Sequence, residues 1–156
     1  MYNHAPKDYV CPMCLLANGK GNDVTNQQDV VYKNSLITAF ISGKWWKNNP
    51  GHVLIIPNKH MENVYDLEEI YGHEIQDFGK EVSIALKEVY HCDGVSFLQH
   101  NEPVGNQEVF HYHMHVLPRY KNDEFYDNFK NTRWVEQKER LPYVEKLRNY
   151  FNDKNE

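Results

Sequence analysis

Three histidines at alternate positions constrain the folding of this chain more than any other feature: His111, His113 and His115. Side chains on a β-strand alternate between its two faces, so a strand would place all three imidazoles on one face. At helical spacing the same rings would point in different directions. The residues between them are aromatic or apolar, which favours a strand. We therefore expect a strand over residues 107–119, with regular pairing ending near Pro118, because proline cannot donate a hydrogen bond to a neighbouring strand.

Such a row of imidazoles suits three kinds of chemistry: metal binding, proton transfer and nucleophilic attack. The plain alternative is the polar face of an ordinary strand, since the chain has nine histidines to distribute. The strict alternation, and the Pro-Arg dipeptide that follows it, favour a functional site over that alternative.

The histidine pattern is accompanied by Gln107, six residues before His113, and by Pro118-Arg119 after the last histidine. This combination resembles the histidine-triad (HIT) superfamily, and the resemblance covers roughly residues 11–120. It implies that the middle histidine, His113, is a nucleophile that attacks the α-phosphate of a nucleotide anhydride or phosphoramidate. The expected intermediate is a covalent nucleotidyl-histidine, which water then hydrolyses.

The resemblance also assigns roles to four further residues. His115 is expected to bind the phosphate, and Gln107 to donate to the phosphate or to the leaving-group oxygen. Asn101 is expected to contact the phosphate from the preceding loop, and His52 to support and orient the nucleophile. Without the resemblance, Asn101 and Gln107 would be polar residues in or beside a loop, where such residues are common.

A second candidate site begins with Cys11 and Cys14, which form a Cys-x-x-Cys pair. In a reducing compartment such a pair indicates metal binding or redox chemistry before a structural disulfide. Zinc would need two further ligands to complete a tetrahedron. By resemblance to bacterial HIT proteins with an N-terminal Cys-x-x-Cys, these are His60 and His111. The resemblance implies a structural zinc ion that holds the strand of the nucleophile in place; a thioredoxin-like redox pair is the alternative.

Two features depart from the family pattern. Many HIT proteins carry an aspartate that binds the ribose shortly after the second strand, where this chain has Ser42. The loop that follows, residues 42–51, is longer than usual and contains Trp45 and Trp46. We expect these tryptophans to pack under the loop or in a subunit interface; the alternative is a surface on which a base stacks.

The remaining elements follow from hydrophobic periodicity and turn residues. We expect a short helix over 11–17, strands over 30–34, 36–41, 52–57 and 95–100, and an irregular segment over 121–134. A long helix should cover 66–90, with Asp66 as its cap, and a closing helix 141–151, with Pro142 in its first turn. The prediction is an α+β fold, HIT-like by resemblance: an antiparallel meander of about five strands, with the long helix packed opposite the histidines.

Length and composition fit one domain, residues 1–156, with a core over about 11–120 and a C-terminal extension over 121–156. The net charge is −5 at pH 7, so nothing favours a broad electrostatic surface for nucleic acid or anionic membrane, and we expect neither as a partner. No long apolar run or signal peptide is present, so we expect a cytoplasmic protein. The family resemblance implies a homodimer. It also implies that the protein binds a small-molecule nucleotide as its substrate.

The resulting hypothesis is a nucleotide hydrolase or transferase that acts on nucleoside phosphate anhydrides or phosphoramidates. Dinucleoside polyphosphates are favoured, because Pro118-Arg119 continues the triad strand as in that branch of the family. The main alternative is a nucleotide-binding signalling module with incidental turnover, and a further one is a zinc-stabilised interaction domain. Neither alternative requires His113.

Overall fold

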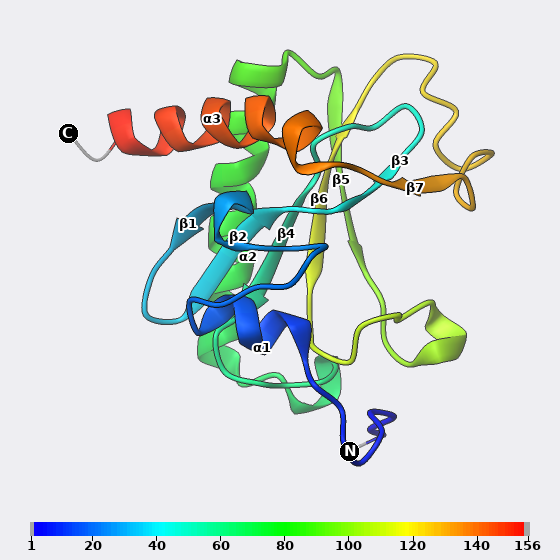
Figure 1. Ribbon diagram of the computed structural model, residues 1–156. Helices are drawn as coiled ribbons and strands as arrows, with labels where there is room; N and C mark the ends of the chain where they lie inside the picture. Colours follow the sequence, from blue (N-terminus) through cyan, green and yellow to red (C-terminus); the bar gives the residue numbers. More distant parts are fainter. Residues whose placement is uncertain (1, 155–156) are drawn as a thin grey trace.

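The computed structural model describes residues 2–154, so positions 1 and 155–156 of the predicted domain lie outside it. A five-stranded antiparallel sheet forms the centre, in the order β1-β2-β4-β6-β5 (Figure 1). Its strands are β1 (Val30–Lys33), β2 (Ile37–Ile41), β4 (Val53–Pro57), β5 (Gly94–Gln99) and β6 (Met114–Arg119). The predicted α+β fold is thus confirmed, with one departure from a simple meander: β6 lies between β4 and β5.

One face of the sheet is covered by α2 (Glu69–Ala85), whose buried residues pack against β2, β4 and β6. The long helix predicted over 66–90 is confirmed, but Asp66 is not its cap. Asp66 ends a separate 3₁₀ turn, Val64–Asp66, and the residue before α2 is Glu68, which makes no capping side-chain bond. A π-helical turn, Leu86–Tyr90, continues α2.

The opposite face of the sheet carries α1 (Pro12–Ala17), in front of the sheet in Figure 1 while α2 lies behind it. Leu16 of α1 packs there against Phe40 and Leu54. No helix within residues 2–154 combines the length and apolar character that a membrane span requires.

The closing helix α3 (Gln137–Asp153) is longer than predicted and packs against β1 and β2. Pro142 therefore lies inside the helix rather than in its first turn. The extra turn at the start consists of polar residues that give no apolar pattern, and it is held by Arg140, whose guanidinium is buried against Asp29. A buried ion pair of this kind depends on a partner far away in the sequence, so helical periodicity could not indicate it.

A second, two-stranded sheet pairs β3 (Lys44–Trp46) with β7 (Thr132–Trp134), beside the main sheet (Figure 1). The predictions of a loop over 42–51 and an irregular segment over 121–134 were wrong at these strands. Each strand is too short for a recognisable alternation, and it forms only because the other supplies its hydrogen bonds. Trp45 and Trp46 are both buried, as the packing interpretation predicts, but Trp46 also lines the cavity that contains His113 and His115, so the base-stacking alternative stays open for it.

Residues 107–113 do not belong to the strand predicted over 107–119, because β6 begins at Met114. The segment before it bonds elsewhere: the Tyr112 N–H donates to the carbonyl of Met61 at 2.6 Å. At the other end, Pro118 lies within the strand, where we expected pairing to stop. On the side that faces β4, pairing with β6 ends at Val116, so no β4 partner needs the N–H that Pro118 lacks. On the same residue, the carbonyl accepts a hydrogen bond from Asn49 Nδ2 at 2.9 Å.

Candidate functional site

A cavity of about 550 Å³ opens on the face of the sheet opposite α2. His113 and His115 form part of its wall, and the other walls come from α1, β2, β3, β7 and the loop before β6. The lining residues used below are His100, Lys44, Glu108, Phe129, Lys130 and Trp134. The fold therefore gathers segments from most of the chain around two of the three histidines.

His113 is held in one tautomer by its neighbour. Its Nδ1 lies 2.7 Å from the backbone carbonyl of His111, and a carbonyl can only accept, so Nδ1 carries the proton. Nε2 then has a free lone pair. Burial lowers the pKa of His113 below its usual value. A neutral imidazole with a free Nε2 is the form that a nucleophile requires.

His52 contacts His115 rather than His113: its Nε2 lies 3.3 Å from His115 Nδ1. Burial lowers the pKa of His52 to about 3 and that of His115 well below its usual value, so both rings are neutral. His52 Nδ1 is buried without a hydrogen-bond partner among the described residues, and a buried N–H is rarely left unpaired. The proton of His52 therefore belongs on Nε2, which donates to His115 Nδ1. His115 is left with an N–H at Nε2, a donor for an anionic ligand.

The two predicted polar contacts, Gln107 and Asn101, do not line the cavity in this structure. Gln107 is buried, and its Oε1 accepts from the Glu102 N–H at 2.8 Å while its Nε2 donates to the Glu62 carbonyl at 2.5 Å. Asn101 Oδ1 accepts from the Val64 N–H at 2.8 Å. These bonds fix the loop before β6, and the predicted contacts of both side chains with a phosphate stay predictions.

Glu102 holds this loop in a strained conformation, with φ 62° and ψ 156°, which is a region that glycine occupies readily. Replacing Glu102 with glycine or with alanine removes the same contacts to His4 and Tyr65, but only alanine retains the Cβ. We expect the Glu102→Gly variant to have a free energy of unfolding about 1 kcal/mol higher than the Glu102→Ala variant, as measured by urea denaturation. The same pair of substitutions at Glu108, whose φ is not positive, should give the opposite order. An alanine variant at position 102 as stable as the glycine variant would contradict the strain.

His100 is a cavity residue that the motif did not indicate. Its ring lies 5.7 Å from that of His115, between centroids, and 6.3 Å from that of Phe129. The signal available was its position at the end of β5, beside Asn101. Arg119, by contrast, is directed away from the cavity and bonds to Asp123 at 2.6 and 2.9 Å.

The structure brings together the four predicted metal ligands, Cys11, Cys14, His60 and His111, with their ligand atoms all within 4.8 Å of one another. His111 Nδ1 lies 3.3 Å from Cys11 Sγ and 3.5 Å from Cys14 Sγ, and His60 Nδ1 lies 3.2 Å from Cys14 Sγ. A tetrahedral zinc ion with ordinary bond lengths would separate sulfur and nitrogen ligands by about 3.6 Å. The donor set and its spacing therefore fit such an ion.

His111 connects this cluster to His113. Its Nε2 lies 2.9 Å from the Pro57 carbonyl and must donate there, which leaves the Nδ1 lone pair directed at the two thiols. Its backbone carbonyl is the group that holds His113. The metal cluster thus lies next to the group that sets the orientation of His113.

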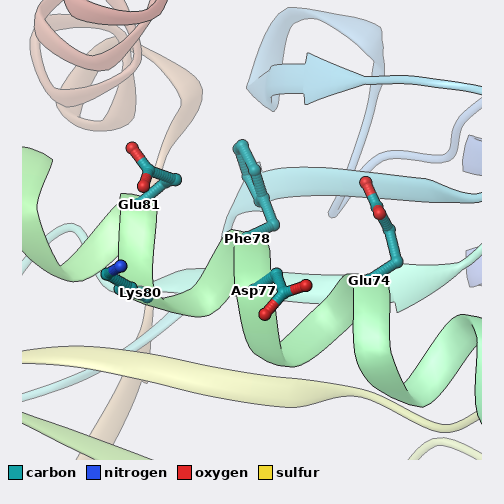
Figure 2. A pocket seen from close by; sticks show the side chains of 5 residues that line it. All are labelled: Glu74, Asp77, Phe78, Lys80 and Glu81. Atoms are coloured by element: carbon teal, nitrogen blue, oxygen red, sulfur yellow. The ribbon is translucent and has the colours of Figure 1, made fainter.

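A hollow on α2 has no such chemistry (Figure 2). It is lined by Glu74, Asp77, Phe78, Lys80 and Glu81, all from one helix. Two of its carboxylates have structural partners, because Glu74 accepts from Asn34 and Glu81 pairs with Lys154. The cavity at the histidines is therefore the candidate functional site.

A family model described as the HIT domain matches residues 24–122. The chain belongs to the HIT family. The purine nucleoside phosphoramidase of Escherichia coli K12 is 38% identical to it over 95 residues, which cover 57% of this chain and 74% of the relative.

Solved structures of HIT proteins share the fold. A zinc-bound histidine triad family protein from Mycobacterium smegmatis superposes with a TM-score of 0.74 at 21% identity, covering 94% of this chain and 97% of that one. The diadenosine triphosphate hydrolase of Plasmodium falciparum does so with a TM-score of 0.73 at 18% identity, covering 85% and 82%. At these identities the likeness concerns the fold alone.

Proposed function

We propose that this HIT protein is a nucleotide hydrolase or transferase that attacks the α-phosphate of nucleoside phosphate anhydrides or phosphoramidates. The observation that carries the proposal is the hydrogen bond from His113 Nδ1 to the His111 carbonyl, which leaves a nucleophilic Nε2 on a ring in the cavity wall. The activities named for the E. coli relative and the Plasmodium neighbour support the same class of substrate.

In the proposed reaction His113 Nε2 forms a bond to the α-phosphorus, and the bond from phosphorus to the leaving group breaks. The leaving group departs with the electron pair: a phosphate leaves as an anion, whereas an amine also takes up a proton from water. Water then attacks the phosphorus, the N–P bond breaks, its electron pair returns to Nε2, and a proton passes to solvent. The neutral His115, with an N–H at Nε2, is the donor proposed to bind the non-bridging oxygens.

The experiment that tests this proposal is the mass of the intact protein after brief incubation with a diadenosine polyphosphate or a fluorogenic adenosine phosphoramidate. An alkaline quench preserves phosphohistidine. We expect an adduct of one nucleotide in the wild type and none after His113→Ala. Nucleotide binding without adduct or turnover, in zinc-loaded protein, would favour the alternative of a binding module.

Zinc is the metal proposed for the cluster, with Cys11, Cys14, His60 and His111 as ligands. The closed set of four ligands leaves no open position, so the ion would stabilise the structure rather than activate water. The zinc named for the Mycobacterium neighbour supports this assignment.

Zinc removal should therefore lower stability. At a free zinc concentration one hundred times the dissociation constant, binding to the folded state alone stabilises a protein by about 2.7 kcal/mol. We expect zinc to raise the unfolding temperature of chelator-treated wild type, but not that of a Cys14→Ser variant. A Cys92→Ala variant is the control, because Cys92 is buried away from the cluster and should respond to zinc like the wild type. An equal response from all three proteins would show that the cluster is not the zinc site.

We also propose a homodimer, on the basis of family membership. β5 stands at one edge of the sheet, and an edge strand can pair with a second copy. Light scattering should give twice the mass of one chain, and a monomer mass would contradict the dimer. A cytoplasmic location stays a prediction from the sequence.

A further inference from the structure

An exposed tryptophan lies at the rim of the cavity. Trp134, on β7, is 63% exposed, although Trp45 and Trp46 on the paired strand are 4% and 8% exposed. Single exposed apolar side chains are common on protein surfaces, so the position of this indole matters more than its exposure. Trp134 lines the same cavity as His113. Its indole therefore offers a stacking surface that is connected to the histidines.

Two lysine side chains line the cavity together with this indole. Lys44 is the cross-strand partner of Trp134, with its Nζ 5.8 Å from the centre of the indole ring. Its present partner is the carboxylate of Glu108 at 2.8 and 2.9 Å, an exposed pair that a ligand anion could exchange. Lys130 also lines the cavity and forms no ion pair within residues 2–154. The two lysines and Glu108 together give this rim a net charge of +1, in a chain whose net charge is −5.

Phe129 and His100 lie in the same cavity wall, and the His100 ring contacts both Phe129 and His115. The cavity thus extends from His113 to the rim, and no helix or strand separates the two ends. Its volume of about 550 Å³ lies in the middle of the range for ligands of drug size. Lys130 and Trp134 also lie beyond residue 122, where the match to the HIT domain ends.

We propose that Trp134, Lys44 and Lys130 form a subsite for the leaving nucleotide. The indole stacks on its base, and the two ammonium groups bind its phosphates. This subsite rests on the proposed function and specifies the class of substrate for it. A leaving group with both an aromatic base and several phosphates identifies dinucleoside polyphosphates, whereas a phosphoramidate of a small amine has nothing to place on the rim.

The test compares two substrates with one reacting nucleotide and different leaving groups: a diadenosine polyphosphate and an adenosine phosphoramidate of a small amine. Base–aromatic stacking supports a loss of about tenfold in kcat/KM for the dinucleotide after Trp134→Ala, mainly through KM. We expect no change for the phosphoramidate. Trp134→Phe should retain most of the dinucleotide activity. Tyr126→Ala removes an equally exposed aromatic side chain outside the cavity lining and should change neither.

Equal losses for both substrates, or none for the dinucleotide, would overturn the subsite. The unfolding temperature of each variant controls for damage to the β3–β7 pair. If the wild type turns over neither substrate, the proposed function fails, and binding still tests the subsite. In the His113→Asn background, calorimetry with a diadenosine polyphosphate as the probe should show affinity reduced about tenfold by Trp134→Ala and reduced by Lys130→Gln more strongly at low salt. Unchanged affinity for this dinucleotide in both variants would reject the subsite.

Discussion

Replacing His113 with alanine should reduce turnover of a diadenosine polyphosphate by at least about 10⁴-fold, because no second side chain can form the covalent intermediate. Nucleotide affinity should remain close to that of the wild type, since the rest of the cavity wall, including His115, is unchanged. The measurements are kcat under saturating substrate and the dissociation constant from calorimetry. The adjacent His115 should not substitute, because its Nδ1 is bonded to His52 and its Nε2 carries the proton.

Alanine also leaves the carbonyl of His111 without its hydrogen bond, which could disturb the metal cluster. His113→Asn is therefore the matched variant, since its amide N–H₂ can still donate to that carbonyl while it offers no nucleophile. Both variants should lose turnover equally. His73→Ala, on the exposed face of α2, should retain it. Turnover by His113→Asn above a hundredth of the wild-type rate would mean that His113 is not the nucleophile.

The largest expected loss of stability follows from Arg140→Met. Arg140 binds Asp29 through Nε at 2.8 Å and Nη2 at 3.1 Å, and the two side chains are 3% and 0% exposed. Methionine would leave the Asp29 carboxylate buried without its charge partner, which typically costs 3–5 kcal/mol. We expect a decrease of about that size in the free energy of unfolding, measured by urea denaturation.

Arg133→Met is the control for this prediction, because the pair of Arg133 with Glu139 is exposed at 58% and 38%. Exposed pairs contribute at most about 1 kcal/mol. The double variant Asp29→Asn, Arg140→Met should recover part of the lost stability, since no buried charge remains without a partner. If the two single arginine variants lose the same amount, the buried pair does not have the stabilising role described.

The main sheet could be predicted because its signals are local. The strand at 53–57 is a continuous apolar run, and α2 repeats its apolar residues at helical spacing. The pairing of β3 with β7 could not be predicted, because each strand has three residues and depends on a partner from a distant part of the chain. The start of β6 was misplaced for a related reason: alternation continues through His113, but the backbone there bonds to residue 61.

In the candidate site, too, some residues could be predicted from the sequence and others only from the folded structure. The triad motif and the Cys-x-x-Cys pair indicated His113, Cys11 and Cys14, because spacing within a motif is local, whereas His60 and His111 were expected from the family resemblance. The structure orients His113 through the His111 carbonyl, where the sequence favoured His52. The bonds that hold Gln107, and the presence of Trp134 at the rim, depend on contacts that only the folded chain makes. No periodicity along the sequence could indicate them.

Two structural contacts join residues far apart in the chain: Lys44 pairs with Trp134 in the cavity wall, and Asp29 binds Arg140 at the start of α3. Such contacts form after local ones, because closing a long loop costs conformational entropy. During synthesis, every strand of the main sheet exists once Arg119 has left the ribosome, while β7 and α3 are still missing. A nascent chain at that stage holds the histidines on an open surface. The cavity wall is therefore completed only once β7 has been made, and premature termination after β6 gives a protein with the triad histidines but without Phe129, Lys130 and Trp134.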